Sequence, residues 1–212
     1  GIGLATAVDP SVSNMGYVTV AIEAAARKKP EYLPKSGAGD NCTIRLDPFG
    51  KIAVTMATTP QGQGHETTAA QVVADVLNIH PDIITVRTGF DTERNVHTGM
   101  SGTYASQFAV SGLSAVHGAA QKLKKEILRL AAFVLQAKEE ELELGYNEMG
   151  GVVRVRGTDK MIPYIGLANI VNTNSAVLPE ELYELTLNCR YTWRAPFKLP
   201  DVKTKIGNLT LT

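Results

Sequence analysis

The chain has 212 residues, of which 44% are hydrophobic and 20% charged, a composition typical of a globular protein with a substantial core. Its 21 basic and 21 acidic residues cancel to a formal net charge of zero, which disfavours nucleic acid or an anionic membrane as a partner. The longest apolar runs fall short of the roughly 20 residues that span a bilayer, and no signal-peptide pattern opens the chain, so we expect a cytoplasmic protein without a membrane span.

The first part of the chain reads as strands. Residues 2–8 and 18–22 are strand-prone. After a basic, proline-bearing linker, apolar residues alternate with polar ones over residues 42–58, which predicts a hairpin that turns at residues 47–50.

A crossover unit follows this hairpin. Apolar residues at helical spacing predict a helix over about residues 67–78, and Pro81 ends it. The run "IITVRTG", residues 83–89, predicts a further strand. Strand, glycine turn, helix and strand in this order favour helices layered on a sheet.

The second half contains the longest helical pattern. A loop rich in glycine, serine and threonine, residues 98–112, leads into one apolar stripe that predicts a helix running to about Lys138. A short helix end and a hairpin follow over residues 139–157, then a short helix over residues 165–171 and an alternating strand over residues 185–193.

These elements predict an α+β fold, with mixed sheet hairpins and two units in which a glycine-rich loop leads into a helix. We expect a single, partial domain over residues 1–212. Its parts are the strands and first glycine-turn helix (1–80), the second loop and long helix (81–145), and a hairpin with a C-terminal strand (146–212).

Two loops are candidate anion sites. In "TTPQGQGHETTAAQ", Gly62 and Gly64 flank Gln63 just before a helix. A helix N-terminus carries unpaired N–H groups and a partial positive charge, so a turn without side chains lets an anion approach. Gln63 can donate and accept hydrogen bonds. His65 could donate to a phosphate or pack locally, and the sequence leaves both open.

The second loop offers the same device through Gly102, Thr103, Ala105 and Ser106. Two such cradles suit an elongated, phosphorylated ligand better than a lone phosphate. A glycine turn by itself is more often a plain connection. Neither loop is a Walker loop or a dinucleotide fingerprint, because no Gly-Lys-Ser/Thr follows and the third glycine is missing.

No protein metal site is expected. Cys42 and Cys189 are too few for a four-cysteine zinc site or an iron–sulfur cluster, and each lies on the apolar side of a predicted strand, as inert buried thiols do. His80, His97 and His117 share no metal-ligand spacing.

Three segments in order carry a family resemblance: "GQGHETTAAQVVADVLNI", "TGFDT" and "GTYASQFAVSGLSAVHGAAQKLKKEI". With them, nearly the whole chain resembles the molybdenum-cofactor-binding large subunit of the xanthine oxidase family of molybdenum hydroxylases. The similar branch includes the large subunits of aerobic carbon monoxide dehydrogenases.

The resemblance implies a cofactor site. It places Gln63 against an apical oxo ligand of molybdenum and the pterin, with Gly62, Gly64 and His65 beside the cofactor phosphates. The second loop would hold the pterin or its dinucleotide extension. The implied cofactor is molybdopterin or molybdopterin cytosine dinucleotide, whose dithiolene binds the metal. The second-loop residues are Gly102, Thr103, Tyr104, Ala105 and Ser106.

Two departures from the family stand out. The family commonly has arginine where this chain has Gln107, so a fixed positive charge is missing. The family's catalytic glutamate, a base that takes a proton during hydroxylation, has no match here. Glu66 is the acid nearest the turn, but it belongs to the cofactor motif. We therefore assign no catalytic residue in this chain beyond the oxo contact of Gln63.

The resemblance implies an oxidoreductase that hydroxylates an aldehyde, an N-heterocycle or a CO-like substrate with oxygen from water. This chain would be part of its catalytic subunit and inactive alone. Implied partners are the remainder of the molybdenum subunit and the subunits that carry [2Fe-2S] centres and FAD. A non-catalytic carrier of a pterin or another phosphorylated ligand is the alternative, and a cofactor-free scaffold is a third.

Overall fold

The computed structural model describes residues 1, 3–5, 39–89, 106–194, 204–206 and 209–211. The predicted strand at residues 18–22 and His97 lie outside these ranges, and so do Gly102, Thr103, Tyr104 and Ala105 of the second loop. Of the predicted strand at residues 2–8, only residues 3–5 are described, and they are not in a strand.

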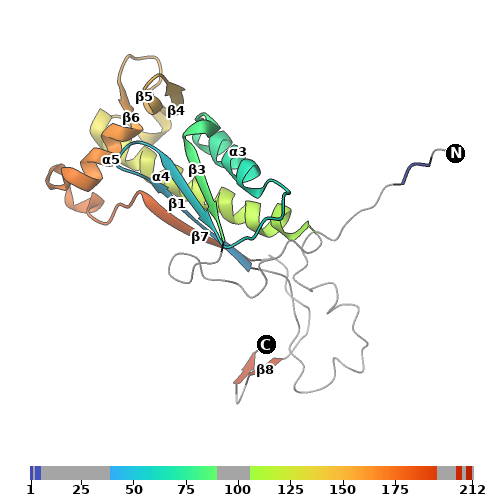
Figure 1. Ribbon diagram of the computed structural model, residues 1–212. Helices are drawn as coiled ribbons and strands as arrows, with labels where there is room; N and C mark the ends of the chain where they lie inside the picture. The colour runs from blue at the N-terminus through green and yellow to red at the C-terminus, as the bar shows by residue number, and fades with distance from the viewer. Residues whose placement is uncertain (2, 6–38, 90–105, 195–203, 207–208, 212) are drawn as a thin grey trace.

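A four-stranded mixed sheet forms the centre of the fold (Figure 1). Its strands lie in the order β3-β2-β1-β7. The β1–β2 hairpin and the β1–β7 pair are antiparallel, whereas β2 and β3 run parallel. The strands are β1 (Gly39–Leu46), β2 (Ile52–Met56), β3 (Ile84–Thr88) and β7 (Asn188–Arg194).

The predicted hairpin and its turn are confirmed. Asp47 Oδ1 accepts hydrogen bonds from the backbone N–H groups of Phe49 and Lys51, both at 2.9 Å. Gly50, at φ 77°, donates its N–H to the Asp47 carbonyl at 3.0 Å. The aspartate thus closes the turn and fixes the register of the strands on either side.

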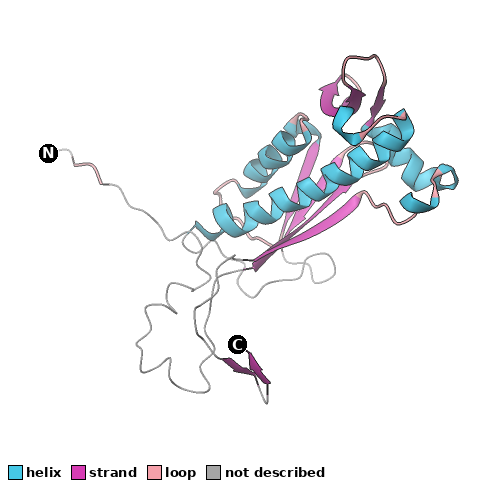
Figure 2. Cartoon of the chain, turned by 180° about the vertical axis from the view of Figure 1, so that it is seen from behind, coloured by secondary structure: helices cyan, strands magenta, loops and turns pink. Residues whose placement is uncertain are grey.

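Two helices cover one face of this sheet: α3 (His65–Leu77) and α4 (Leu113–Leu135). They lie on the same side in Figure 1 and in the reverse view of Figure 2. The other side of the sheet carries no helix among the described residues. The α+β class with a mixed sheet is therefore confirmed.

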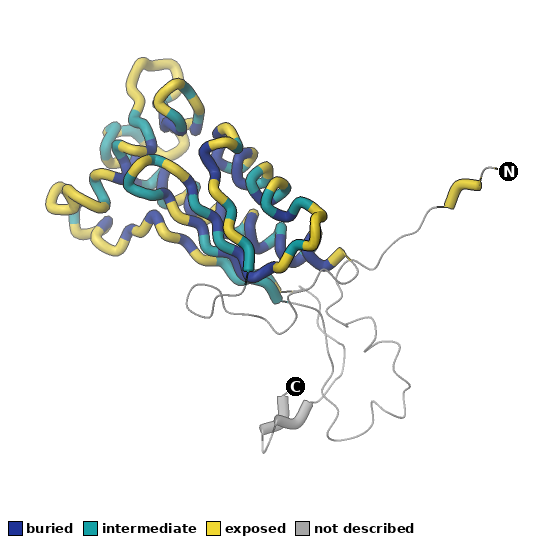
Figure 3. The backbone as a smooth tube through the Cα atoms, in the orientation of Figure 1, coloured by how far each residue is buried: buried dark blue, intermediate teal, exposed yellow. Residues whose placement is uncertain are grey.

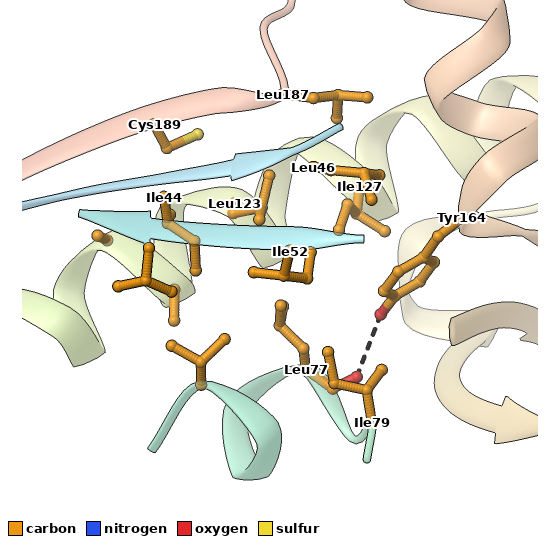
Figure 4. Packing of buried hydrophobic residues seen from close by; sticks show 14 of the residues in the cluster. Ile44, Leu46, Ile52, Leu77, Ile79, Leu123, Ile127, Tyr164, Leu187 and Cys189 are labelled. Carbon is orange, nitrogen blue, oxygen red and sulfur yellow. Dashed lines mark hydrogen bonds between the residues drawn. The ribbon is translucent and has the colours of Figure 1, made fainter. Parts of the chain in front are cut away.

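The core lies between the sheet and these helices (Figures 3 and 4). Alternate strand residues point into it, and the apolar stripes of α3 and α4 meet them. Cys42 and Cys189 belong to this core, as predicted. Fully buried members include Ile44, Ile52, Val54, Leu77, Leu123 and Ile127.

A smaller unit packs at one end. Strands β4 (Leu142–Asn147), β5 (Gly150–Val155) and β6 (Met161–Pro163) form an antiparallel sheet that leads into α5 (Tyr164–Thr173). The buried Tyr164 hydroxyl donates to the Leu77 carbonyl at the end of α3, at 3.1 Å (Figure 4). Burial raises the pKa of Tyr164, so the hydroxyl keeps the proton that this bond requires.

Short pieces complete the described chain. Three-residue 3₁₀ turns form at Pro81–Ile83, Glu139–Glu141, Ser175–Val177 and Glu180–Leu182. Strands β8 (Thr204–Ile206) and β9 (Leu209–Leu211) pair with each other. No helix in the described ranges combines the length and apolarity that crossing a membrane requires.

Helix boundaries differ from the sequence predictions. Helix α3 begins at His65 rather than Thr67, because Gly64 rather than a polar side chain occupies its N-cap. Helix α4 ends at Leu135 rather than near Lys138, because Gln136 adopts a left-handed conformation with φ 52°. Before α4, Phe108–Gly112 form a π-helical turn that the helical pattern did not distinguish.

Candidate cofactor site

The first glycine turn lies at the edge of the sheet where β2 and β3 end. These strands run parallel, so both carboxyl ends meet there, and the Gly89 N–H donates to the Thr58 carbonyl at 2.9 Å. Helix α3 starts from this edge at Gly64. Open α/β sheets commonly bind ligands outside the carboxyl ends of parallel strands, where helices present their N-termini.

Gly62 and Gly64 give the turn its shape. Their φ angles of 98° and 73° lie in the region that favours glycine. No atom of the described residues lies within 4 Å of a Cβ added at either position, so among these residues the space beside both glycines is open. Within the same ranges, no side chain caps the N-terminus of α3. The turn therefore combines an uncapped helix start with unobstructed backbone.

Gln63 is exposed on this turn. Its Oε1 accepts a hydrogen bond from the Gln61 N–H, which holds the side chain close to the backbone of the turn. The carboxamide therefore stays at the open edge, where its amide group belongs to the surface that a ligand would meet.

His65 is turned into the protein and is only 2% exposed. Its Nδ1 lies 3.0 Å from Thr58 Oγ1, and its ring stacks on Phe108 with centroids 3.7 Å apart and an interplanar angle of 19°. Burial lowers the pKa of His65, so the imidazole is neutral at neutral pH. The side chain is packed locally in this structure, and its contact with a phosphate stays a prediction.

The His65–Phe108 stack joins the two loop-to-helix units. Phe108 begins the π-helical turn ahead of α4, directly after Ser106 and Gln107. Ser106 has φ 54°, which lies in the left-handed region of backbone conformation. Two starts of helices that are far apart in sequence thus lie against each other at one edge of the fold.

Gln107 carries an unsatisfied polar atom beside this junction. The residue is 3% exposed, and its Oε1 has no hydrogen-bond partner in the described part of the chain. Its backbone carbonyl accepts from Ser111 Oγ at 3.0 Å, and that hydroxyl also lies 3.3 Å from Asp40 Oδ2. A buried carbonyl oxygen without a partner costs free energy, which makes Gln107 a candidate for a ligand contact.

Glu66 already accepts a hydrogen bond within the chain. Thr88 Oγ1 donates to Glu66 Oε1 at 2.8 Å, which ties the start of α3 to the end of β3. Its own backbone N–H lowers the pKa of Glu66, and the Thr88 bond lowers it further. The carboxylate is therefore a poor proton acceptor, in keeping with its assignment outside catalysis.

The described side chains include no cluster of three or more histidine, cysteine, aspartate or glutamate residues that could hold a metal ion. Burial raises the pKa of Cys42, and it raises that of Cys189 to about 11, so both thiols stay protonated. Inert thiols are the state predicted from their strand positions.

The structure places several of the residues that the sequence suggests near one another. Gly62, Gln63, Gly64 and His65 lie together at the edge, and Ser106 lies two residues before the ring on which His65 packs. Sequence reasoning missed Thr58 and Phe108. Thr58 carried no sequence signal, and Phe108 looked like an ordinary apolar residue at the start of a helix.

Residues 1–207 match the family model of the molybdopterin cofactor-binding domain, which spans nearly the whole chain. Curated relatives agree with this match. The nicotine 6-hydroxylase large subunit of Paenarthrobacter nicotinovorans is 36% identical over 119 residues, which cover 55% of this chain and 14% of that protein. The carbon monoxide dehydrogenase large chain of Hydrogenophaga pseudoflava is 34% identical over 151 residues, covering 71% and 18%.

Solved structures give the same result. Quinoline 2-oxidoreductase from Pseudomonas putida 86 superposes with a TM-score of 0.65 at 30% identity, covering 77% of this chain and 20% of that one. Reconstituted CO dehydrogenase from Oligotropha carboxidovorans superposes with a TM-score of 0.61 at 31% identity, covering 76% and 19%. This chain belongs to the molybdenum-binding large subunits of the xanthine oxidase family. It spans about a fifth or less of the relatives' own length.

Proposed function

We propose that this chain forms part of the catalytic subunit of a molybdenum hydroxylase and holds the pterin and phosphate groups of its cofactor. The observation that carries the proposal is the His65–Phe108 stack, because it brings the open Gly62–Gly64 turn and the end of the second loop to one edge. The unsatisfied Gln107 Oε1 supports it, since a pterin offers ring N–H donors to such an acceptor.

Different residues would bind different parts of the cofactor. The open backbone at Gly62 and Gly64 and the uncapped start of α3 suit phosphate oxygens. The carboxamide of Gln63, which accepts from the Gln61 N–H, would contact the ligand from the turn. Of the second loop, Gly102, Thr103, Tyr104 and Ala105 lie outside the described residues, and we propose that they complete the cradle with Ser106.

His65 would act by shape rather than by charge. Its neutral, buried ring packs the starts of the two helices together and excludes water from between them. We infer that its backbone N–H, rather than its imidazole, faces the phosphates. The positive charge available to them is then the partial charge at the helix N-terminus, since Gln107 stands where the family commonly has arginine.

The cofactor would supply the redox chemistry: when bound, it provides oxygen derived from water and accepts two electrons from the substrate. Glu66 would not take up the proton, because Thr88 and a backbone N–H hold it ionised. The proton acceptor, the substrate pocket and the iron–sulfur and flavin partners would belong to the rest of the assembly. A cytoplasmic location stays a prediction from composition.

The names of the relatives suggest candidate substrate classes. The relatives support an N-heterocycle, such as those named in the nicotine and quinoline enzymes, or carbon monoxide, and an aldehyde is a candidate from the family resemblance alone. Because the Glu66 carboxylate is hydrogen-bonded to Thr88 and is a poor proton acceptor, one alternative is a non-catalytic module that carries a pterin or another phosphorylated ligand.

A matched pair of glycine substitutions tests the site. Gly64 and Gly157 have nearly equal φ angles of 73° and 70°, and a Cβ at either would have nothing within 4 Å. Aspartate tolerates this backbone and would add a negative charge. In the assembly purified from its native host, Gly64→Asp should lower pterin and molybdenum content by about tenfold or more, whereas Gly157→Asp should not.

The readout is the pterin oxidation product by fluorescence and molybdenum by elemental analysis. Equal content in both variants would show that the turn does not hold the cofactor. Pterin that stays bound to the isolated chain, in the absence of every other subunit, would favour the carrier.

A further inference from the structure

The face of the central sheet opposite α3 and α4 is polar. Successive strand residues point to opposite sides, so Ile44 and Leu46 enter the core while Thr43 and Arg45 point away from it. Figures 1 and 2 show the helices on one side of the strands only. No helix or strand in the described ranges covers the other side.

The pairing register arranges this face in two rows across the four strands. Arg190, Thr43, Thr55 and Arg87 are successive partners in one row. Asn188, Arg45, Ala53 and Thr85 form the next. Arg87 and Arg190 therefore stand on the two edge strands, and Arg45 stands on the central strand β1 among the shorter side chains of Thr43, Thr55 and Ala53.

This arrangement leaves an open concavity of about 700 Å³. Eight of the residues lining it are those of the two rows, and the ninth is Asp47. With strands spaced about 4.8 Å apart, the edge strands β3 and β7 lie roughly 14 Å from each other. A linear occupant would need about four extended residues to reach from one edge to the other.

The charge of this concavity is unbalanced. Arg45, Arg87 and Arg190 are exposed, and within the described part of the chain their guanidinium groups form no hydrogen bond or ion pair. The single carboxylate in the lining is Asp47, whose Oδ1 is committed to the N–H groups of Phe49 and Lys51. Three fixed cations thus face a hollow in a chain whose formal net charge is zero.

We propose that this arginine face docks an acidic segment from the remainder of the molybdenum subunit, an inference that rests on the proposed function. Guanidinium groups bind carboxylates in bidentate fashion, and threonine hydroxyls between them can bond the backbone of the docked segment. Single-stranded nucleic acid fits less well, because the strand positions on this face carry no aromatic side chain on which bases could stack.

The occupant is argued from charge and from chain length. Homologous large chains are more than five times as long as the part that this chain matches, so most of such a subunit lies beyond it. Further chain in such a subunit is available to pack on this exposed polar face. An acidic segment is the covering that leaves none of the three cations unpaired.

Cross-linking with a carbodiimide tests the proposal, because this reagent joins lysine amines to carboxylates in direct contact. The substitutions Arg45→Lys, Arg87→Lys and Arg190→Lys keep the charge and add the reactive amine. A variant that carries these substitutions is purified in the assembly from the native host. Its lysines at positions 45, 87 and 190 should cross-link to aspartate or glutamate residues outside residues 1–212. Lys125, exposed on α4, serves as the internal control.

Arginine modification by phenylglyoxal in the unsubstituted protein gives a second readout. Arg45, Arg87 and Arg190 should react in the isolated chain and be protected about tenfold or more in the assembly, relative to the exposed Arg156 of the hairpin. Equal reactivity would overturn the proposal. Protection without cross-links would overturn the acidic partner, and protection of the isolated chain by inorganic phosphate alone would make the face a free-anion site.

These outcomes are separate from those of the proposed function. An assembly that contains molybdenum and pterin but leaves the arginines reactive would defeat only the docking proposal. Protected, cross-linked arginines in an assembly without pterin would defeat only the cofactor proposal.

Discussion

His65 illustrates how a residue in a cofactor motif can act without its charge. Thr58 and Phe108 hold its ring in a buried position, and burial lowers its pKa. The ring packs where two helices start, and a contact between His65 and a phosphate stays a prediction.

This burial predicts a pH dependence of stability. The folded chain binds the His65 proton less readily than the unfolded chain, whose imidazole titrates near the ordinary pKa of 6.5. Unfolding free energy should therefore fall as the pH is lowered from about 7.5 through 6.5 towards the folded pKa. In His65→Phe this component should vanish. Urea denaturation of both proteins at a series of pH values measures it, and an unchanged slope in the variant would contradict the assignment.

Substitution of Gln107 should raise the unfolding free energy and lower the retention of pterin. Its buried Oε1 lacks a partner in the described chain, so replacement by methionine, of similar shape, removes an unsatisfied group. Gln107→Met should raise the unfolding free energy of the isolated chain by about 1 kcal/mol. It should also reduce pterin retention in the assembly. Gln121→Met, at an exposed position of α4, is the control and should change neither. A destabilised Gln107→Met chain would count against the unsatisfied oxygen.

At the scale of elements, local patterns predicted most of the fold. The hairpin at β1 and β2, helix α3, helix α4 and strand β7 follow from periodicity and from turn residues such as Asp47. What local patterns missed depends on tertiary contacts. The π-helical turn at Phe108–Gly112 has the same apolar spacing as an α-helix, and the Tyr164–Leu77 bond joins residues that no local pattern relates.

The packing of α4 on the sheet depends on a glycine. A Cβ at Gly118 would lie 2.3 Å from Cδ1 of Tyr191 on β7, which is too close for any real contact. Gly118→Ala should therefore lower the unfolding free energy by about 2 kcal/mol, despite the higher helix propensity of alanine.

The control for this substitution is Gly145→Ala on β4. Its Cβ would have no neighbour nearer than 3.5 Å, an ordinary contact. This variant should shift the unfolding free energy by less than about 0.5 kcal/mol. Denaturant unfolding compares the two, and similar losses would mean that α4 can move away from Tyr191 at little cost.

At the scale of the whole molecule, the candidate site exists because the fold brings distant segments together. The sequence predicted the two cradles separately, at residues 62–65 and 102–106. It did not predict that His65 would stack on Phe108, since that contact depends on the placement of α3 and α4 on one face of the sheet. The catalytic base and substrate pocket were not predictable here either, because no residue of this chain matches them.

The central claim is that this chain contributes part of a cofactor cleft that partners complete. Molybdenum and pterin should be measured in the chain purified together with its native partners and, separately, in the chain alone. If partners complete the cleft, the complex should contain molybdenum and a fluorescent pterin oxidation product, and the isolated chain should contain neither. Absence of molybdenum and pterin from both preparations would contradict it and would leave Gly62–Gly64 as an ordinary connecting turn.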